Sequence, residues 1–439
     1  MTSQNKQIPS SPSFFLNRIL NLINVNKDPV CFFRTQINQK GDLFKINFPG
    51  FEFNYLLHPD GIQYVLEKNH MNYKKSKVYD SLKLALGNGL LTSDGEFWKK
   101  QRKTIQPLFN TNFIEQMCTD MSVAIDEFMH AIGNSPVDLT SKLANLTIDI
   151  AARAFFATTE IQFSEFISMK TNEINKFMNQ RVLFPFIPMW LPLASHRRFN
   201  RSMIEINEKV KSLIVDATKN DMQPSLLSML ATSKSISDET IRDEVLTFLI
   251  AGHETTTNAM SFLLYLLSKY PEVKQRVKEE TELYVREDNP QYKSLQKLTY
   301  TKAVINEVLR LFPPAWLISR ESIDEDEVMG FVVPSKSVIN IPTFLVQRHE
   351  VFWDKPNVFN PERFLGNDNR HKFSFLPFGG GPRFCIGMQF AYTEIMIFLV
   401  KLFRFSDFRV FNQHVDLDFL ITLRPKNKIN FQLFKKNTT

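Results

Sequence analysis

The sequence predicts a mainly helical protein with a smaller β-rich lobe. Helical spacing of apolar residues dominates from about residue 75 to residue 310, and short strand-like runs lie on either side of that stretch. In addition, one long run between residues 237 and 270 is apolar nearly all round. A helix that is apolar on every side belongs inside a protein, so we expect this one to be central.

Residues 1–30 are interpreted as an N-terminal extension. Their apolar residues, between positions 14 and 23, are interrupted by Asn and Arg. A membrane-spanning helix needs about 20 mostly apolar residues, and a signal peptide needs a continuous apolar stretch. We therefore expect no integral membrane anchor, and we expect this segment to pack on the rest of the chain rather than touch a membrane. Residues 1–439 are expected to form a single domain, located in the cytoplasm.

The first strand-like region, about residues 40–66, contains the runs DLFKINF and FEFNYLL. Farther along, FIEQMCTDMSVAIDEFMHAI has helical periodicity, while prolines at 185, 188 and 192 predict a loop or short turns. That apolar loop is either a lid over an access route or ordinary buried packing. Beyond residue 310 we expect strands in WLISRESI, SVINIPTFL, DLDFLITLRP and INFQLF, with a helix in MQFAYTEIMIFLVKLF.

The long apolar helix has clear ends and an unusual centre. Ser237 and Asp238 are N-cap candidates, and Pro271 ends the helix. Its centre holds Gly252 and three consecutive threonines, which are poor helix formers, next to Glu254. A carboxyl group is rarely buried without a role. Such local exceptions tend to mark functional sites.

Composition and charge exclude several classes of protein. Hydrophobic residues make up 43% and charged residues 23% of the chain, as in globular proteins, which excludes a disordered chain or a fibre. The net charge of +7 is mild and no nucleic-acid-binding motif accompanies it, so we expect no nucleic acid partner. Cys31, Cys118 and Cys385 are far apart, which argues against a disulfide framework or a structural zinc site.

The segment FGGGPRFCIG, residues 378–387, is a glycine-rich loop that contains a cysteine. Consecutive glycines permit close backbone approach and positive φ. A cysteine near backbone N–H groups, Arg383 and a helix N-terminus would be held as a thiolate. A phosphate-binding loop would end in Gly-Lys-Ser/Thr, and that ending is absent.

This loop resembles the haem-binding loop of the cytochrome P450 superfamily, Phe-x-x-Gly-x-Arg-x-Cys-x-Gly, and every fixed position is filled. The resemblance implies that Cys385 is the axial thiolate ligand of haem b (iron protoporphyrin IX) and that Arg383 pairs with a haem propionate. It also places Phe378, Gly379 and Gly387 at the cofactor. The implied architecture is the cytochrome P450 fold, with haem between a long central distal helix and a Cys-bearing proximal loop.

Further segments extend the resemblance, which covers the chain from about residue 40 to its end. Trp98 and Arg102 match the family's Trp-x-x-x-Arg helix, and their N–H groups suit a propionate carboxylate. Arg320 lies where related sequences often place another propionate partner; a surface arginine is the alternative.

Glu307-Val308-Leu309-Arg310 and Pro361-Glu362-Arg363-Phe364 resemble the family's Glu-x-x-Arg helix and its meander. The match implies that Glu307, Arg310 and Arg363 form a structural triad. For residues 307 and 310, a solvated surface pair is the alternative.

The helix centre Ala251-Gly252-His253-Glu254-Thr255-Thr256 resembles the family's Ala/Gly-Gly-x-Asp/Glu-Thr-Thr/Ser motif. It implies that Glu254 and Thr255 are catalytic and deliver protons to bound oxygen, while small Ala251 leaves room for O₂. The alternatives are a threonine that bonds back to its own helix and a salt-bridged glutamate.

The resemblance implies a haem-thiolate monooxygenase that uses O₂ for hydroxylation or oxidative O-demethylation of a small organic substrate. A lipid or terpenoid is the default expectation, and a methylated sugar is the alternative. By analogy, the pocket walls would be Val78, Tyr79, Phe248, Ala315, Trp316, Leu317, Ile318 and Thr422.

Little chain follows Cys385, so we expect no fused reductase. Electrons from NAD(P)H would arrive through an external ferredoxin or flavodoxin with its reductase. Basic residues at positions 99–103 and 370–372 would attract this partner by electrostatic steering. Three alternatives stay open: a peroxide-driven or redox-neutral enzyme of the same fold, a non-catalytic haem ligand-binding protein, and a haem-free thiol protein.

Overall fold

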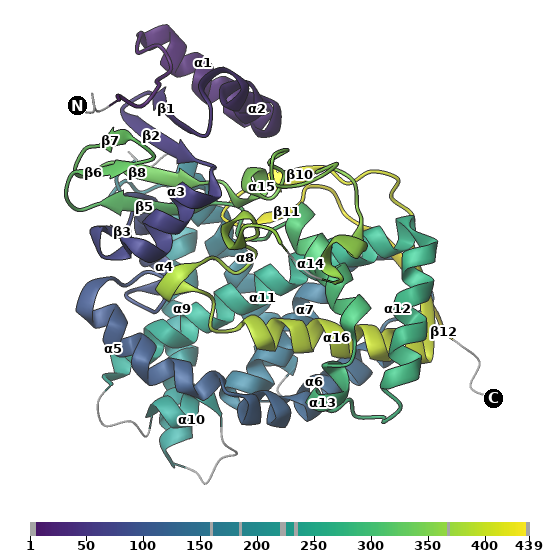
Figure 1. Ribbon diagram of the computed structural model, residues 1–439. Helices are drawn as coiled ribbons and strands as arrows, with labels where there is room; N and C mark the ends of the chain where they lie inside the picture. Colours follow the sequence, from purple (N-terminus) through teal and green to yellow (C-terminus); the bar gives the residue numbers. More distant parts are fainter. Residues whose placement is uncertain are drawn as a thin grey trace. The chain divides into compact units, whose positions relative to one another are not determined.

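The computed structural model describes residues 6–158, 161–183, 187–219, 225–231, 236–366 and 369–435. The chain divides into two compact units, which are treated one at a time. The first unit comprises Met1–Tyr79, Arg310–Phe359 and Asn367–Cys385, and the second comprises Asp80–Leu309, Asn360–Gly366 and Ile386–Thr439. Figure 1 labels most of the α-helices and strands of both. The prediction of a single domain over residues 1–439 stays a prediction.

The first unit is built on a five-stranded sheet with short helices. In sheet order its strands are β1 (Leu43–Phe48), β2 (Phe51–Leu56), β8 (Val338–Ile341), β5 (Ile318–Ser322) and β3 (Tyr73–Lys75). Neighbouring strands are antiparallel except β2 and β8, which are parallel. A separate hairpin joins β6 (Asp326–Val328) and β7 (Phe331–Val333). The helices are α1 (Phe15–Lys27), α2 (Pro29–Lys40), α3 (Pro59–Gln63), η1 (Tyr64–Lys68), η2 (His70–Asn72), η3 (Lys77–Tyr79), α15 (Thr343–Val346), η6 (Lys372–Ser374) and η7 (Gly381–Arg383).

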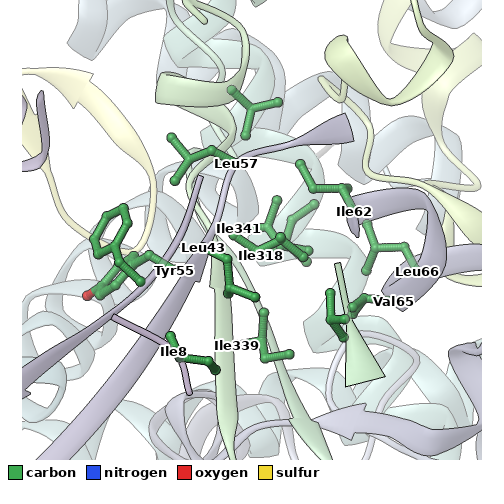
Figure 2. Packing of buried hydrophobic residues seen from close by; sticks show 14 of the residues in the cluster. Ile8, Leu43, Tyr55, Leu57, Ile62, Val65, Leu66, Ile318, Ile339 and Ile341 are labelled. Atoms are coloured by element: carbon green, nitrogen blue, oxygen red, sulfur yellow. The ribbon is translucent and has the colours of Figure 1, made fainter. Parts of the chain in front are cut away.

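Buried aliphatic side chains from the sheet and from the helices beside it form the core of this unit. Figure 2 shows Ile318, Ile339 and Ile341 of the sheet next to Leu66 of η1. Ile318 and Ile341 are cross-strand partners. Alternate residues of a strand face opposite sides, so the paired strands present a continuous apolar face.

The N-terminal segment packs on this unit through α1. Leu22 lies against the apolar core, and the Asn21 amide donates to the Asn47 carbonyl at 2.9 Å. Phe14 and Phe15 point outward, with 78% and 73% of their surface exposed. Among the described residues, no helix combines the length and the apolar character needed to cross a bilayer.

The second unit is mainly helical, as the sequence predicts. Its helices are α4 (Asp80–Leu86), α5 (Gly95–Ile105), η4 (Gln106–Phe109), α6 (Thr111–Ala131), α7 (Leu139–Phe156), α8 (Ile161–Leu183), α9 (Ala194–Lys219), α10 (Leu226–Ala231), α11 (Asp238–Lys269), α12 (Pro271–Tyr284), α13 (Tyr292–Leu295), α14 (Thr299–Leu311), η5 (Pro361–Phe364) and α16 (Met388–Phe405). Strands β4 (Val137–Asp138), β12 (Asn430–Lys435) and β9 (Ser406–Val410) form one sheet, and β10 (Leu417–Phe419) and β11 (Leu423–Pro425) form a hairpin.

Helix α11 is the predicted long buried helix, and both predicted ends are confirmed. The Ser237 hydroxyl accepts a hydrogen bond from the Thr240 N–H, and the helix ends at Lys269, just before Pro271. The helix continues without a break through its glycine and threonines. Tertiary packing outweighs the low helix propensity of these residues in a buried helix.

Two sequence predictions of secondary structure were wrong in detail. The run SVINIPTFL is not one strand, because β8 ends at Ile341 and α15 begins at Thr343. Pro342 between them lacks the N–H that a strand would need. The run DLDFLITLRP is a hairpin of two short strands, β10 and β11. The loop predicted over residues 181–193 is confirmed over residues 187–193, which are non-helical, but it begins later than predicted, because α8 continues to Leu183. Residues 184–186 lie outside the described residues.

Candidate active site

The loop that carries Cys385 is fixed by its own backbone and by glycines. The Cys385 N–H donates to the Phe378 carbonyl at 3.0 Å, which closes the loop. Gly379 and Gly381 have φ angles of 74° and 67°, a region that L side chains rarely adopt. A Cβ atom at Gly381 would lie 1.8 Å from the carbonyl oxygen of Leu66. The glycines therefore let the loop pack directly on η1, and the Cys385 side chain is exposed at its end.

The other predicted cofactor residues fall into two sets. In the first unit, Arg320 is 5% exposed on β5, and its guanidinium donates to the Ser319 carbonyl at 3.0 Å. In the second unit, Trp98 is buried on α5, and Arg102 of the same helix donates to the Gln106 side chain at 2.8 Å. The predicted residues of the first unit are Phe378, Gly379, Arg383, Cys385 and Arg320, and those of the second unit are Trp98, Arg102, Ala251, Glu254, Thr255 and Gly387.

A half-exposed patch interrupts the buried surface of α11 at its centre. The residues that form it are Ala251, Gly252, Glu254 and Thr255, whereas the neighbouring stretches 246–250 and 256–267 are buried. The Thr255 hydroxyl donates to the Ala251 carbonyl at 2.8 Å. A hydroxyl oxygen keeps acceptor capacity while it donates. The patch thus offers a hydroxyl and a carboxyl group to the space beside the helix.

Glu254 is held by hydrogen bonds from two other elements of the same unit. The Asn175 amide of α8 donates to one carboxylate oxygen and the Thr422 hydroxyl donates to the other, both at 2.8 Å. The Asn258 amide donates to Thr422 in turn, at 3.2 Å. Burial raises the pKa of Glu254, while these hydrogen bonds and the charge of Arg424 lower it. The balance leaves a carboxyl group that is easier to protonate than a solvated one.

Sequence analysis missed part of this network. It placed Thr422 in the pocket wall, whereas in the structure its hydroxyl serves Glu254. Asn175 and Asn258 were missed. Both are buried asparagines, and a buried side-chain amide normally has a hydrogen-bond partner, but the sequence around Asn175 is polar and does not distinguish it.

Glu307 and Arg310 are both fully buried on α14. The Glu307 carboxylate pairs with Arg363 at 3.2 Å and accepts the Asn360 N–H at 2.9 Å. The Arg310 guanidinium donates to backbone carbonyls, including that of Gln347 at 2.9 Å. These contacts hold η5, through Arg363, and the neighbouring segments without regular secondary structure at Asn360 and Gln347. This is a structural use of buried charge.

The residues predicted to line the pocket occupy both units. Val78, Tyr79, Trp316 and Leu317 are half-buried, Ala315 is exposed and Ile318 is buried, all in the first unit. In the second unit, the Phe248 ring lies 5.7 Å from the Phe155 ring and 5.5 Å from that of Phe109, and Thr422 is buried.

Comparison with known proteins settles the family. A model of the family described as Cytochrome P450 matches residues 9–432, nearly the whole chain. This chain belongs to the cytochrome P450 family. As a cytochrome P450 it is an oxidoreductase of the monooxygenase type, and the predicted fold class is confirmed.

Relatives of this cytochrome P450 occur in bacteria and plants. Cyclooctatin synthase and cyclooctat-9-en-7-ol 5-monooxygenase of Streptomyces melanosporofaciens are each 30% identical, and each match covers 84% of this chain and 83% of the relative. Protein LUTEIN DEFICIENT 5, chloroplastic, of Arabidopsis thaliana is 29% identical over 84% of this chain and 68% of its own length. The cytoplasmic location expected from the sequence stays a prediction.

The family implies a haem cofactor, and the donor set of this cytochrome P450 fits one. A cysteine thiolate is an established ligand of haem iron, and Cys385 is exposed in a glycine-cradled loop. Cys118, by contrast, is buried, and burial raises the pKa of its thiol to about 11. Arg320, Arg383 and the Trp98–Arg102 pair have the N–H donors that could hold propionate carboxylates.

Proposed function

We propose that this cytochrome P450 is a haem-thiolate monooxygenase that inserts one oxygen atom of O₂ into an apolar small molecule. The half-exposed patch of α11, with Glu254 and Thr255 at the centre of a buried helix, carries the proposal. The reaction balances as substrate–H plus O₂, two electrons and two protons, giving substrate–OH and water. A haem with a thiolate ligand supplies the iron at which O₂ is bound and reduced.

In this proposal the chain's residues bind the cofactor and move protons. Cys385 ligates the iron, and Arg383, Arg320, Trp98 and Arg102 bind the propionates. Thr255 would offer its hydroxyl to the reacting oxygen, and Glu254 would supply protons to that hydroxyl. The raised pKa of Glu254 supports that role, because a general acid works best when its pKa lies near the operating pH.

We infer that electrons come from an external ferredoxin or flavodoxin, itself reduced from NAD(P)H through a reductase. Two lysines of α5, Lys100 and Lys103, are exposed and suit an acidic partner. The other predicted basic residues have partners within the chain: Lys99 pairs with Glu96 at 2.6 Å, Lys372 with Glu67 at 3.1 Å and His371 with Asp60 at 3.1 Å. Arg102 donates to Gln106, and Arg370 lies over the Trp353 ring. Steering therefore rests chiefly on Lys100 and Lys103.

The substrate we propose is a largely apolar molecule, hydroxylated at carbon. The apolar residues among the predicted pocket walls support this, and so does a relative whose name states that it oxygenates cyclooctat-9-en-7-ol. Oxidative O-demethylation of a methyl ether is the second candidate, which release of formaldehyde would reveal.

Reconstituted turnover tests the proposed function. Purified holoenzyme is supplied with NAD(P)H, reductase and ferredoxin or flavodoxin, together with apolar alcohols that shift the haem spin state on binding. We expect one oxygen atom from ¹⁸O₂ in the product. Product formed only with peroxide, and none with the electron-transfer proteins, would instead assign the peroxide-driven alternative. A ligand that binds without any turnover would assign a sensor.

A further inference from the structure

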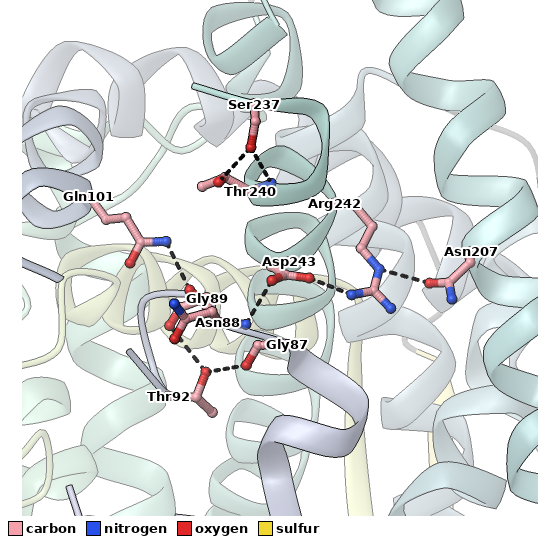
Figure 3. Close-up of polar contacts among 10 residues, drawn as sticks. All are labelled: Gly87, Asn88, Gly89, Thr92, Gln101, Asn207, Ser237, Thr240, Arg242 and Asp243. Atoms are coloured by element: carbon pink, nitrogen blue, oxygen red, sulfur yellow. Dashed lines mark hydrogen bonds and ion pairs between the residues drawn. The ribbon is translucent and has the colours of Figure 1, made fainter. Parts of the chain in front are cut away.

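The loop between α4 and α5 lies directly on α11, at a point outside the proposed oxygen site. A Cβ atom at Gly87 would lie 2.2 Å from the Asp243 carboxylate, and one at Gly89 would lie 2.2 Å from the Thr247 hydroxyl. Figure 3 shows Asp243 and the two glycines side by side. Only glycine at both positions permits this approach, so the contact is tight and specific.

Two consecutive carboxyl groups of α11 bind the backbone of this loop. The Asn88 N–H donates to Asp243 at 2.7 Å, and the Leu90 N–H donates to Glu244 at 3.1 Å. Gln101 of α5 completes the contact, because its amide donates to the second Glu244 oxygen at 2.7 Å. Gln101 also donates to the Asn88 carbonyl at 3.0 Å, as Figure 3 shows.

The network is buried and hydrogen-bonded throughout its centre. Glu244 has no exposed surface, and 6% of Gln101 is exposed. The Gln101 carbonyl accepts from the Ser93 hydroxyl at 2.6 Å. A buried side chain with all its polar atoms engaged has one favourable orientation, so the network determines the rotation of α5 about its axis.

The rotation of α5 matters because α5 and α11 also carry residues proposed to contact the cofactor. Gln101 is three residues after Trp98 and adjacent to Arg102. On α11, Glu244 precedes Ala251 by seven residues, which is about two helical turns, or roughly 10 Å, on the same face. The hydrogen bond from Gln101 to Glu244 thus connects α5, which carries Trp98 and Arg102, with α11, which carries the proposed oxygen site.

We propose that Glu244 and Gln101 are positioning residues that fix α5 on α11 so that Trp98 and Arg102 are presented to the haem. The inference rests on the proposed function, in which these two side chains bind a propionate. Neither Glu244 nor Gln101 is among the residues assigned there, and neither touches the cofactor in this proposal.

Haem loss to excess apomyoglobin, followed optically at pH 7, tests the inference. Loss of the Gln101–Glu244 bond leaves a buried polar group without its partner, so Glu244→Leu and Gln101→Leu should each lose haem about tenfold faster than wild type. Glu244→Gln keeps an acceptor oxygen and should stay within about threefold of wild type. The double Leu variant should lose haem no faster than either single variant, since the two residues act as one unit. Wild-type rates in both Leu variants would overturn the inference.

Hydrogen exchange supplies a second readout that does not depend on haem. In the wild-type chain the amide protons of Asn88 and Leu90 should be protected, and both Leu variants should expose them. The matched control is Glu280→Leu. Glu280 also accepts two backbone N–H hydrogen bonds, from Tyr300 at 2.8 Å and Thr301 at 2.7 Å, but these bonds are part-buried and join α12 to α14. Glu280→Leu should leave the rate of haem loss and the protection of both amide protons unchanged. If Glu280→Leu accelerated haem loss as much as Glu244→Leu does, the effect of Glu244 would be one of general stability and not of positioning.

Arg102→Gln separates this inference from the proposed function. Faster haem loss in Arg102→Gln with no change in Glu244→Leu would leave the propionate assignment intact and overturn the positioning role. If Arg102→Gln lost haem at the wild-type rate, the assignment of Arg102 to a propionate would be wrong.

Discussion

Glu254 shows how one carboxyl group is accommodated in a buried helix. The Asn175 amide and the Thr422 hydroxyl each donate to one of its oxygens, so its partial burial leaves no unsatisfied acceptor. The donors are neutral, so their hydrogen bonds only partly offset the effect of burial, which raises the pKa. A carboxyl group held in this way can exchange a proton without breaking an ion pair.

Removal of the acid should separate electron consumption from product formation. In Glu254→Gln, and likewise in Thr255→Val, we expect product formation to fall about a hundredfold, because positioned proton transfer contributes at least that much. NAD(P)H consumption should fall far less, with the difference appearing as hydrogen peroxide. Product and peroxide are measured together in the reconstituted system. If both variants still formed one product molecule for each NAD(P)H consumed, Glu254 and Thr255 would have no catalytic role.

At the scale of elements, α5 and α11 depend on glycines that no helix or strand pattern requires. Gly89 faces both the Thr247 hydroxyl and the Asp243 carbonyl, the latter 2.8 Å from a would-be Cβ atom. A backbone atom cannot move aside as a flexible side chain can. The loop must therefore retreat from α11 if a methyl group is added.

Gly89→Ala should lower the free energy of unfolding by about 1–3 kcal/mol, the usual cost of overpacking. Gly133→Ala is the matched control, because nothing lies within 4 Å of its would-be Cβ atom. That variant should be neutral or slightly stabilising, since alanine restricts the unfolded chain. Both are measured by thermal and denaturant unfolding. Equal stability of the two variants would contradict the tight contact.

The elements differ in how well sequence predicts them. Helix α11 was predictable because its apolar pattern, its Ser237 cap and Pro271 are all local signals. The Cys385 loop was predictable because its pattern lies within ten residues. The Glu254 network was not, because Asn175 and Thr422 are 79 and 168 residues away along the chain. Contacts at such separations leave no local sequence pattern. A single asparagine or threonine does not indicate which distant residue it contacts.

At the scale of the whole molecule, two buried titratable groups make stability depend on pH in opposite directions. Burial raises the pKa of Glu244 to about 8, with the neighbouring charge of Asp243 adding to the effect, while bonds from Leu90 and Gln101 oppose it. Arg242 pairs with Asp243 and not with Glu244. Burial lowers the pKa of His253 to about 4.

The direction of each pH dependence follows from whether the folded or the unfolded chain binds more protons. Between its unfolded pKa of 4.5 and its folded pKa of about 8, Glu244 holds a proton that the unfolded chain releases, so stability falls as pH rises. For His253 the unfolded chain binds more protons between pH 4 and 6.5, so stability rises with pH there. From pH 6.5 to 8 only Glu244, of these two, contributes a slope.

We therefore expect wild-type stability to decline from pH 6.5 to 8 by up to about 1.4 kcal/mol per pH unit more than that of Glu244→Gln. Denaturant unfolding at several pH values measures the difference between the two proteins. Parallel curves across this window would show that Glu244 is already ionised in the folded chain.

The whole proposed activity depends on a bond between the Cys385 sulfur and haem iron, and the optical spectrum of the reduced, CO-treated protein tests that bond most directly. Wild-type protein expressed with ample haem precursor should show the strongly red-shifted Soret band of thiolate ligation. Cys385→Ser should lose that band, because serine offers no thiolate, while Cys118→Ser should keep it. A red-shifted band that survives in Cys385→Ser, or wild-type protein that is colourless, would contradict the account.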